Sequence, residues 1–108
     1  MTTERLGFED LVAGQADAYI RYNENLRKLE ALFGAVESRT VTTPPSSPTD
    51  GQVWIIPSGA TGAWVGKTDQ LAHWYNEAWH YYVPCDRLRH WVKDTDVEVI
   101  FKVGVGWV

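Results

Sequence analysis

Apolar residues near the start of the chain recur at the spacing of an α-helix. Their separations alternate between three and four residues, which places them in the a and d positions of a heptad repeat. Gly34 comes directly after Phe33, at a place where a left-handed glycine commonly ends a helix. We therefore expect a helix over about residues 16–33. The residues of the stripe are Tyr19, Tyr22, Leu26, Leu29, Phe33 and Val36.

The stripe has two interpretations that the sequence leaves open. It can pack on the protein's own sheet, or it can form the seam of an oligomeric coiled coil. Phe8, Val12 and Gln15 would extend the heptad register upstream, and a symmetric trimer is the simplest oligomer that buries such a seam. Monomers rarely expose a contiguous apolar stripe. The expected oligomer or partner interface is therefore Tyr19, Tyr22, Leu26, Leu29 and Phe33.

After the helix the pattern changes to short strands separated by turn residues. Residues 37–43 and 52–57 predict strands, residues 44–51 form a proline-rich linker, and a glycine turn leads to a strand at 63–65. This order predicts an α+β fold, with an N-terminal helix followed by a small antiparallel β-hairpin sheet. We assign residues 1–36 to an arm and attachment helix, and residues 37–108 to the linker and β domain.

The β domain contains an internal repeat. Residues 64–79 align with residues 91–107 at an offset of 27, and each unit predicts strand, Thr-Asp turn, strand, tight loop and strand. In the first unit a loop over residues 75–78 places Trp74 opposite Trp79, and His73 opposite His80 on the other face. We expect the tryptophans to form the core, and these are Trp54, Trp64, Trp74, Trp79, Trp91 and Trp107.

Composition narrows the class of protein. The 108 residues make one domain, and a net charge of −4 argues against binding to a nucleic acid backbone. The single cysteine, Cys85, excludes an internal disulfide. We expect neither a secretion signal nor a membrane span, because no long uninterrupted apolar segment occurs.

The residues capable of catalysis do not form a recognisable constellation. His80 and Cys85 would need contact in space, and the pair His73 and His80 lacks further metal ligands at useful spacing. Residues 66–68 (GKT) resemble the end of a phosphate loop, but its first glycine position holds a threonine. The acidic residues 94, 96 and 98 lack the rest of a calcium loop. We therefore expect a protein that is not an enzyme and has no cofactor or metal.

Several short segments form a pattern along nearly the whole chain. They are residues 13–16 (AGQA), 23–24 (NE), 35–39 (AVESR), 54–57 (WIIP), 59–64 (GATGAW) and 91–92 (WV), with Gly51, Trp74, Trp79, Pro84 and Trp107. Together they resemble a domain-of-unknown-function family of bacteriophages, prophages and gene transfer agents, whose members are tail-fibre, spike or other virion proteins. The chain departs from that family in the turns at residues 76–78 and 85–90.

The resemblance implies a structural protein of the virion, assembled in the host cytoplasm. It implies an attachment or adaptor module of a tail fibre, spike or capsid appendage, with copies of itself and other virion subunits as partners. No catalytic residue is carried over from the family. The alternative is a carbohydrate-binding module that recognises a bacterial surface glycan through exposed tryptophan or tyrosine rings.

Overall fold

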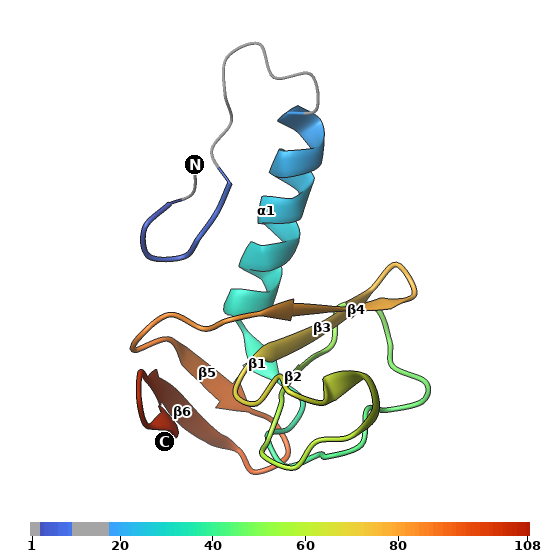
Figure 1. Cartoon of the computed structure of the whole chain (residues 1–108), viewed down its shortest axis with the longest axis vertical. Helices are drawn as coiled ribbons and strands as arrows, with labels where there is room; N and C mark the ends of the chain where they lie inside the picture. The colour runs from blue at the N-terminus through green and yellow to red at the C-terminus, as the bar shows by residue number, and fades with distance from the viewer. Residues whose placement is uncertain (1–2, 10–17) are drawn as a thin grey trace.

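The computed structural model describes residues 3–9 and 18–108, in which one α-helix is followed by seven short strands. The helix stands on a body of two sheets and projects away from it (Figure 1). This order agrees with the α+β class. The elements are α1 (Ala18–Leu32), β1 (Ala35–Val36), β2 (Val53–Ile55), the 3-10 helix η1 (Gly62–Trp64), β3 (Leu71–Tyr75), β4 (Ala78–Tyr82), β5 (Arg89–Val92), β6 (Val97–Lys102) and β7 (Gly106–Trp107).

Helix α1 ends close to where the spacing predicts. Gly34, two residues after the last residue of α1, has a φ of +94°, a left-handed conformation that glycine permits at little cost. Residues 16 and 17 of the predicted helix lie outside the described residues. Phe8 is not part of an upstream helix, because it lies in an arm that turns back on itself, where Thr3 N–H donates to the Phe8 carbonyl, and it packs against the core. Residues 12 and 15 of the proposed upstream register also lie outside the described residues.

The first sheet is antiparallel, with the strand order β2-β3-β4. Its register pairs Trp74 with Trp79 and His73 with His80, as the sequence predicts. The loop is tighter than expected, because the strands continue to Tyr75 and Ala78 and leave only a two-residue turn. When both strands of a hairpin are longer by one residue, every residue still faces the same partner. The shorter loop therefore leaves the register unchanged.

The second sheet corrects the expectation of one small antiparallel hairpin sheet. Its strand order is β1-β5-β6-β7, and β1 pairs with β5 in parallel while the other pairs are antiparallel. β1 begins directly after Gly34 and forms the edge of this sheet, beside β5. The protein therefore has two sheets, one of them mixed.

The predicted strand over residues 37–43 does not form. Only two backbone bonds join this segment to β2: Glu37 N–H donates to the carbonyl of Val53, and Ile55 N–H donates to that of Ser38. The Ser38 hydroxyl accepts a hydrogen bond from Thr40 N–H, and this local bond competes with the hydrogen bonds that would join a strand to its neighbour. Prolines follow from residue 44 and have no N–H to donate.

Two apolar clusters fill the interior. The larger joins Leu32 at the end of α1 to Val36, Val92 and Trp107 of the four-stranded sheet. The smaller contains Trp54 and Trp64. The helix is therefore anchored to the body by its C-terminal end.

The internal repeat is preserved most clearly in its turns. The aspartates of both Thr-Asp turns have positive φ, +70° at Asp69 and +57° at Asp96, a conformation that aspartate tolerates better than most residues. The first residue of each unit differs, because Trp64 lies in η1 whereas Trp91 lies in β5. The predicted strand at residues 63–65 is therefore wrong.

Candidate functional site

The apolar stripe of α1 is exposed along the described part of the helix. The exposed fractions are 56% for Tyr22, 46% for Leu26, 39% for Leu29 and 60% for Phe33. We call these four residues the helix stripe. The side chain of Tyr19, the other predicted interface residue, lies outside the described part of the structure. Ala31 and Leu32 are buried instead, which shows that a different side of the helix faces the body.

A second side of α1 is occupied by the N-terminal arm, residues 3–9. The Asn25 amide exchanges two hydrogen bonds with the backbone of Glu9, at 2.9 and 2.8 Å. The Lys28 ammonium donates to the carbonyl of Gly7 at 3.2 Å. The arm therefore lies beside the helix, as Figure 1 also shows, while the helix stripe stays open.

Charges on α1 are largely neutralised within the helix. Arg21 pairs with Glu24 at 3.2 Å, and Arg27 pairs with Glu30 at 3.6 Å. Such exposed pairs add little to stability. They do leave the helix without a strong electric field of one sign.

Four tryptophans pack together at the three-stranded sheet. The Trp79 ring lies 5.4 Å from that of Trp54, 5.2 Å from that of Trp64 and 5.1 Å from that of Trp74, with edge-to-face geometry. This arrangement suits the quadrupoles of aromatic rings. Trp54 and Trp64 are buried, as is Trp107 in the other cluster, and Trp74 and Trp79 are half-buried.

Trp91 is a correction to the predicted tryptophan core. Its side chain is 44% exposed on the outer face of β5, while the neighbouring His90 and Val92 point inward. A strand alternates its faces, so Trp91 and its two neighbours could not all be buried. Two exposed ion pairs lie on either side of it, Arg89 with Glu98 and Lys93 with Glu37.

The histidines have separate roles. His73 is fully buried, and its ring nitrogens have no hydrogen-bond partner among the described residues. Burial lowers the pKa of His73, a shift that Glu30 opposes and that His80 and Arg27 reinforce. His80 stacks on Tyr75 at 3.7 Å.

His90 lies at the base of the helix, and burial lowers its pKa against the opposing influence of the Gly34 and Ala31 carbonyls. Burial also raises the pKa of the Tyr82 hydroxyl, together with its 3.4 Å hydrogen bond to Tyr75. These shifts follow from packing.

The candidate catalytic pair, His80 and Cys85, lines different hollows of the molecule. Within residues 3–9 and 18–108, no group of three or more His, Cys, Asp or Glu residues has the geometry to hold a metal ion. The acidic residues 94, 96 and 98 are exposed, and Glu98 pairs with Arg89. No pair of general acid and base emerges from these positions.

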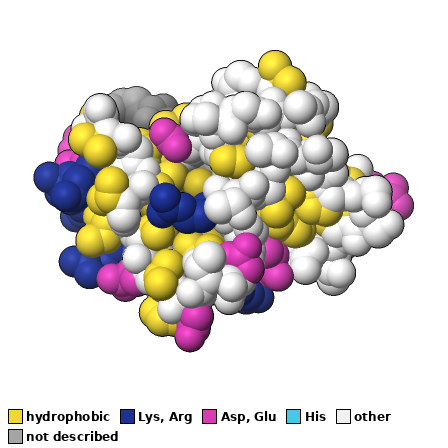
Figure 2. Space-filling view, turned by 90° about the horizontal axis from the view of Figure 1, so that it is seen from below, with side chains coloured by type: hydrophobic (Ala, Val, Ile, Leu, Met, Phe, Trp, Pro, Cys, Tyr) yellow, Lys and Arg dark blue, Asp and Glu magenta, His cyan; other side chains and the backbone are white. Residues whose placement is uncertain are grey.

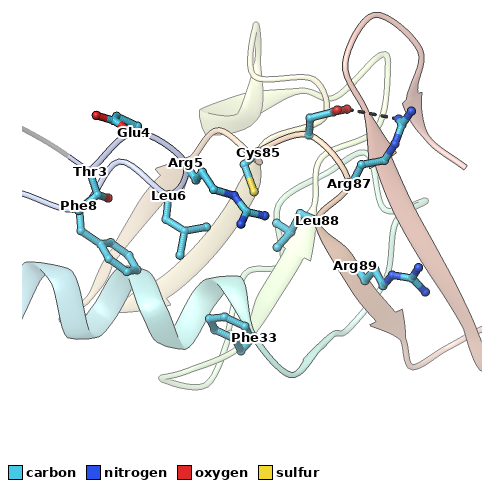
Figure 3. Close-up of a pocket in the computed structure, with 11 residues that line it drawn as sticks. Thr3, Glu4, Arg5, Leu6, Phe8, Phe33, Cys85, Arg87, Leu88 and Arg89 are labelled. Carbon is cyan, nitrogen blue, oxygen red and sulfur yellow. Dashed lines mark hydrogen bonds and ion pairs between the residues drawn. The ribbon is translucent and has the colours of Figure 1, made fainter.

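A hollow that the sequence did not predict lies at the base of α1, between the arm and the loop after β4 (Figure 3). We call it the basal pocket. Phe33 of the helix stripe also contributes to its wall. Figure 2 shows the molecule from below, where acidic and basic side chains are interspersed with apolar ones. In the part of the chain that the structure describes, no helix has the length and apolar character needed to cross a membrane.

Comparison with known proteins identifies a family without an assigned role. Residues 22–108 match the family described as protein of unknown function DUF2793. The matched region begins at Tyr22, so it includes the whole helix stripe and both sheets. No curated protein shows a significant match to the chain.

Proposed function

The chain belongs to the DUF2793 family, and we propose that it is a non-enzymatic structural protein of a phage virion that associates with its own copies through the helix stripe. Its place is an attachment or adaptor module of a tail fibre, spike or capsid appendage, in contact with other virion subunits. The observation that carries the proposal is the exposed apolar stripe on a helix that projects from the body. The virion assignment comes from the resemblance of the sequence segments.

The exposed stripe has enough apolar surface to drive association. The four exposed fractions add to about two whole side chains, and full burial of one such side chain contributes roughly 1.5–3 kcal/mol. Association would therefore gain about 3–6 kcal/mol for each protomer, before the loss of translational and rotational freedom is subtracted.

A second copy of the chain is the occupant that the helix favours. Helix α1 contains three basic and two acidic residues, so its net charge of +1 gives little repulsion between parallel copies. Aromatic residues at a and d positions suit a loose bundle better than a tight dimer, and a trimer closes such a bundle with one kind of contact.

Purified particles test the virion assignment. Particles from a producing strain are banded in a density gradient and their proteins are quantified by mass spectrometry. The proposal predicts peptides of this protein in the particle band, at a fixed ratio to the major structural subunits. Particles that assemble at normal yield without the protein would refute the assignment.

Trp91 supports a second candidate, the binding of a bacterial surface glycan. A half-exposed indole ring with charged pairs on either side can stack on a sugar and leave hydrogen-bonding groups nearby. Tryptophan fluorescence is titrated with host polysaccharide, using Trp91→Ala as the comparison. A response that persists unchanged in Trp91→Ala, or no response at all, would remove this candidate.

A further inference from the structure

The basal pocket has the size and lining of a small-molecule site. Its volume is about 740 Å³, within the range of roughly 300–1,000 Å³ that is typical of ligand pockets. Apolar side chains from three separate parts of the chain form much of its wall. They are Leu6 and Phe8 from the arm, Phe33 from the end of the helix, and Leu88 from the loop before β5.

The guanidinium group of Arg5, an exposed residue, lies beside this apolar surface. The side chain of Arg5 extends across the pocket between Cys85 and Leu88 (Figure 3). No ion pair or hydrogen bond joins it to any residue among 3–9 and 18–108. Among the described residues, the Arg5 donors are therefore left for a ligand that enters the pocket.

Arginine and carboxylate side chains are interspersed around the pocket rim. Arg87 and Arg89 lie on the side opposite the arm, where they pair with Asp86 and Glu98 at 3.3 and 3.1 Å. With Glu98 counted beside Arg89, three arginines are matched by the three carboxylates of Glu4, Asp86 and Glu98, so the surroundings of the pocket are neutral on a chain whose net charge is −4. Of the three lining arginines, Arg5 is the one without an ion pair among residues 3–9 and 18–108, so an anion is favoured at the Arg5 guanidinium itself.

We propose that the basal pocket binds a small amphipathic carboxylate, with its apolar body against Leu6, Phe33 and Leu88 and its carboxylate on Arg5. The guanidinium fork matches a carboxylate in two parallel hydrogen bonds. A neutral apolar molecule would cover the Arg5 guanidinium without accepting its hydrogen bonds, and a cation would be repelled by its charge. This inference goes beyond the proposed function and does not depend on it.

Octanoate is a suitable probe because it combines an eight-carbon body with one carboxylate. The single cysteine of the chain lines the pocket, so the rate of Cys85 alkylation by iodoacetamide reports occupancy without a label. Octanoate is expected to slow the alkylation in a saturable manner, with half-protection on the order of 1 mM for a ligand of this size. Octan-1-ol has the same body without the charge and is expected to protect at least about fivefold less well.

Two matched variants separate the role of Arg5 from a general effect of charge. Arg5→Gln is expected to raise the half-protecting octanoate concentration by about fivefold to tenfold, because one charge-assisted contact is lost. Arg39→Gln removes the same charge from a residue that does not line the pocket, so the half-protecting octanoate concentration should stay unchanged. Half-protecting concentrations are compared instead of absolute alkylation rates, because replacing Arg5 can itself change the reactivity of the Cys85 thiol.

Equal protection by octanoate and octan-1-ol, or an unchanged half-protecting concentration in Arg5→Gln, would overturn the proposal. The same titration in Leu26→Asp, which is designed to dissociate the oligomer, keeps the two proposals distinct. Protection retained in that variant supports a pocket that belongs to the single chain. Absence of protection in both wild type and Leu26→Asp refutes the pocket proposal. It does not affect the proposal that the protein associates through the helix stripe.

Discussion

Replacing Leu26 by aspartate should dissociate the protein without unfolding it. Leu26 lies in the middle of the helix stripe and is 46% exposed in the single chain. Completing its burial between protomers is worth about 1 kcal/mol, on the scale of roughly 1.5–3 kcal/mol for a whole leucine. Burying an aspartate carboxylate in the interface would also cost several kcal/mol of lost hydration. The carboxylates of the equivalent aspartates in the other protomers would repel it as well.

Over three protomers the penalty for assembly is on the order of 10 kcal/mol, and each 1.4 kcal/mol weakens association about tenfold. No trimer should then form at micromolar concentration. Folding of the single chain should change far less, because Leu26 already contacts water and aspartate costs only about 0.5 kcal/mol in a helix.

Ile20→Asp is the matched control. Ile20 is also an exposed apolar residue of α1, with an exposed fraction of 39%, but it lies about 120° around the helix from Leu26. Sedimentation velocity gives the mass of each variant, and circular dichroism gives its helix content. Leu26→Asp that sediments with the wild-type mass, or Ile20→Asp that dissociates equally, would refute the stripe as the interface.

Three further outcomes follow from the fold. Gly34→Ala should destabilise the protein by about 1 kcal/mol in urea unfolding, because a side chain is strained at a φ of +94°, and an unchanged midpoint would contradict this. His73 and His90 have lowered pKa values in the folded state, so the unfolded chain binds more protons than the folded chain below about pH 6.5. The free energy of unfolding should therefore fall as the pH decreases through that value. Equal unfolding free energies at pH 8 and pH 5 would contradict this prediction. Trp64→Ala should cost about 3–5 kcal/mol by opening a cavity among the packed rings, whereas the same change at half-exposed Trp91 should cost far less; similar losses in the two variants would show that the assignment of the core is wrong.

The hairpin of β3 and β4 was predictable because local geometry alone determines its register. Positions facing each other across a hairpin keep a constant sum, so Trp74 and Trp79 stay paired whether the turn has two residues or four. The end of α1 before Gly34 was predictable for a similar reason, since the left-handed residue is close to the helix in sequence.

Features that depend on distant contacts were not predictable from the pattern. The parallel pairing of β1 with β5 joins segments separated by the whole three-stranded sheet. The direction of Trp91 depends on which face of β5 meets the core, and hydrophobicity alone favoured the wrong side. The basal pocket combines an arm and a loop from opposite ends of the chain, and neither segment contains a motif that would indicate a site.

The sequence also left open whether the helix stripe covers its own sheet or another protomer. Alternation of three and four residues is common to both arrangements, and only the position of the helix relative to the body distinguishes them. Within the described residues, Ala31 and Leu32 anchor the helix, while Leu26 and Phe33 remain exposed. The pattern predicted a helix with one apolar side, and the exposure of that side is what supports association.

The native mass of the purified protein tests the central claim most directly. Multi-angle light scattering is measured at several concentrations from the micromolar range upward. The account predicts a trimer of about 37 kDa, three times the 12.3 kDa protomer, that persists on dilution to the micromolar range. A mass of 12.3 kDa at every concentration would contradict self-association through the helix stripe.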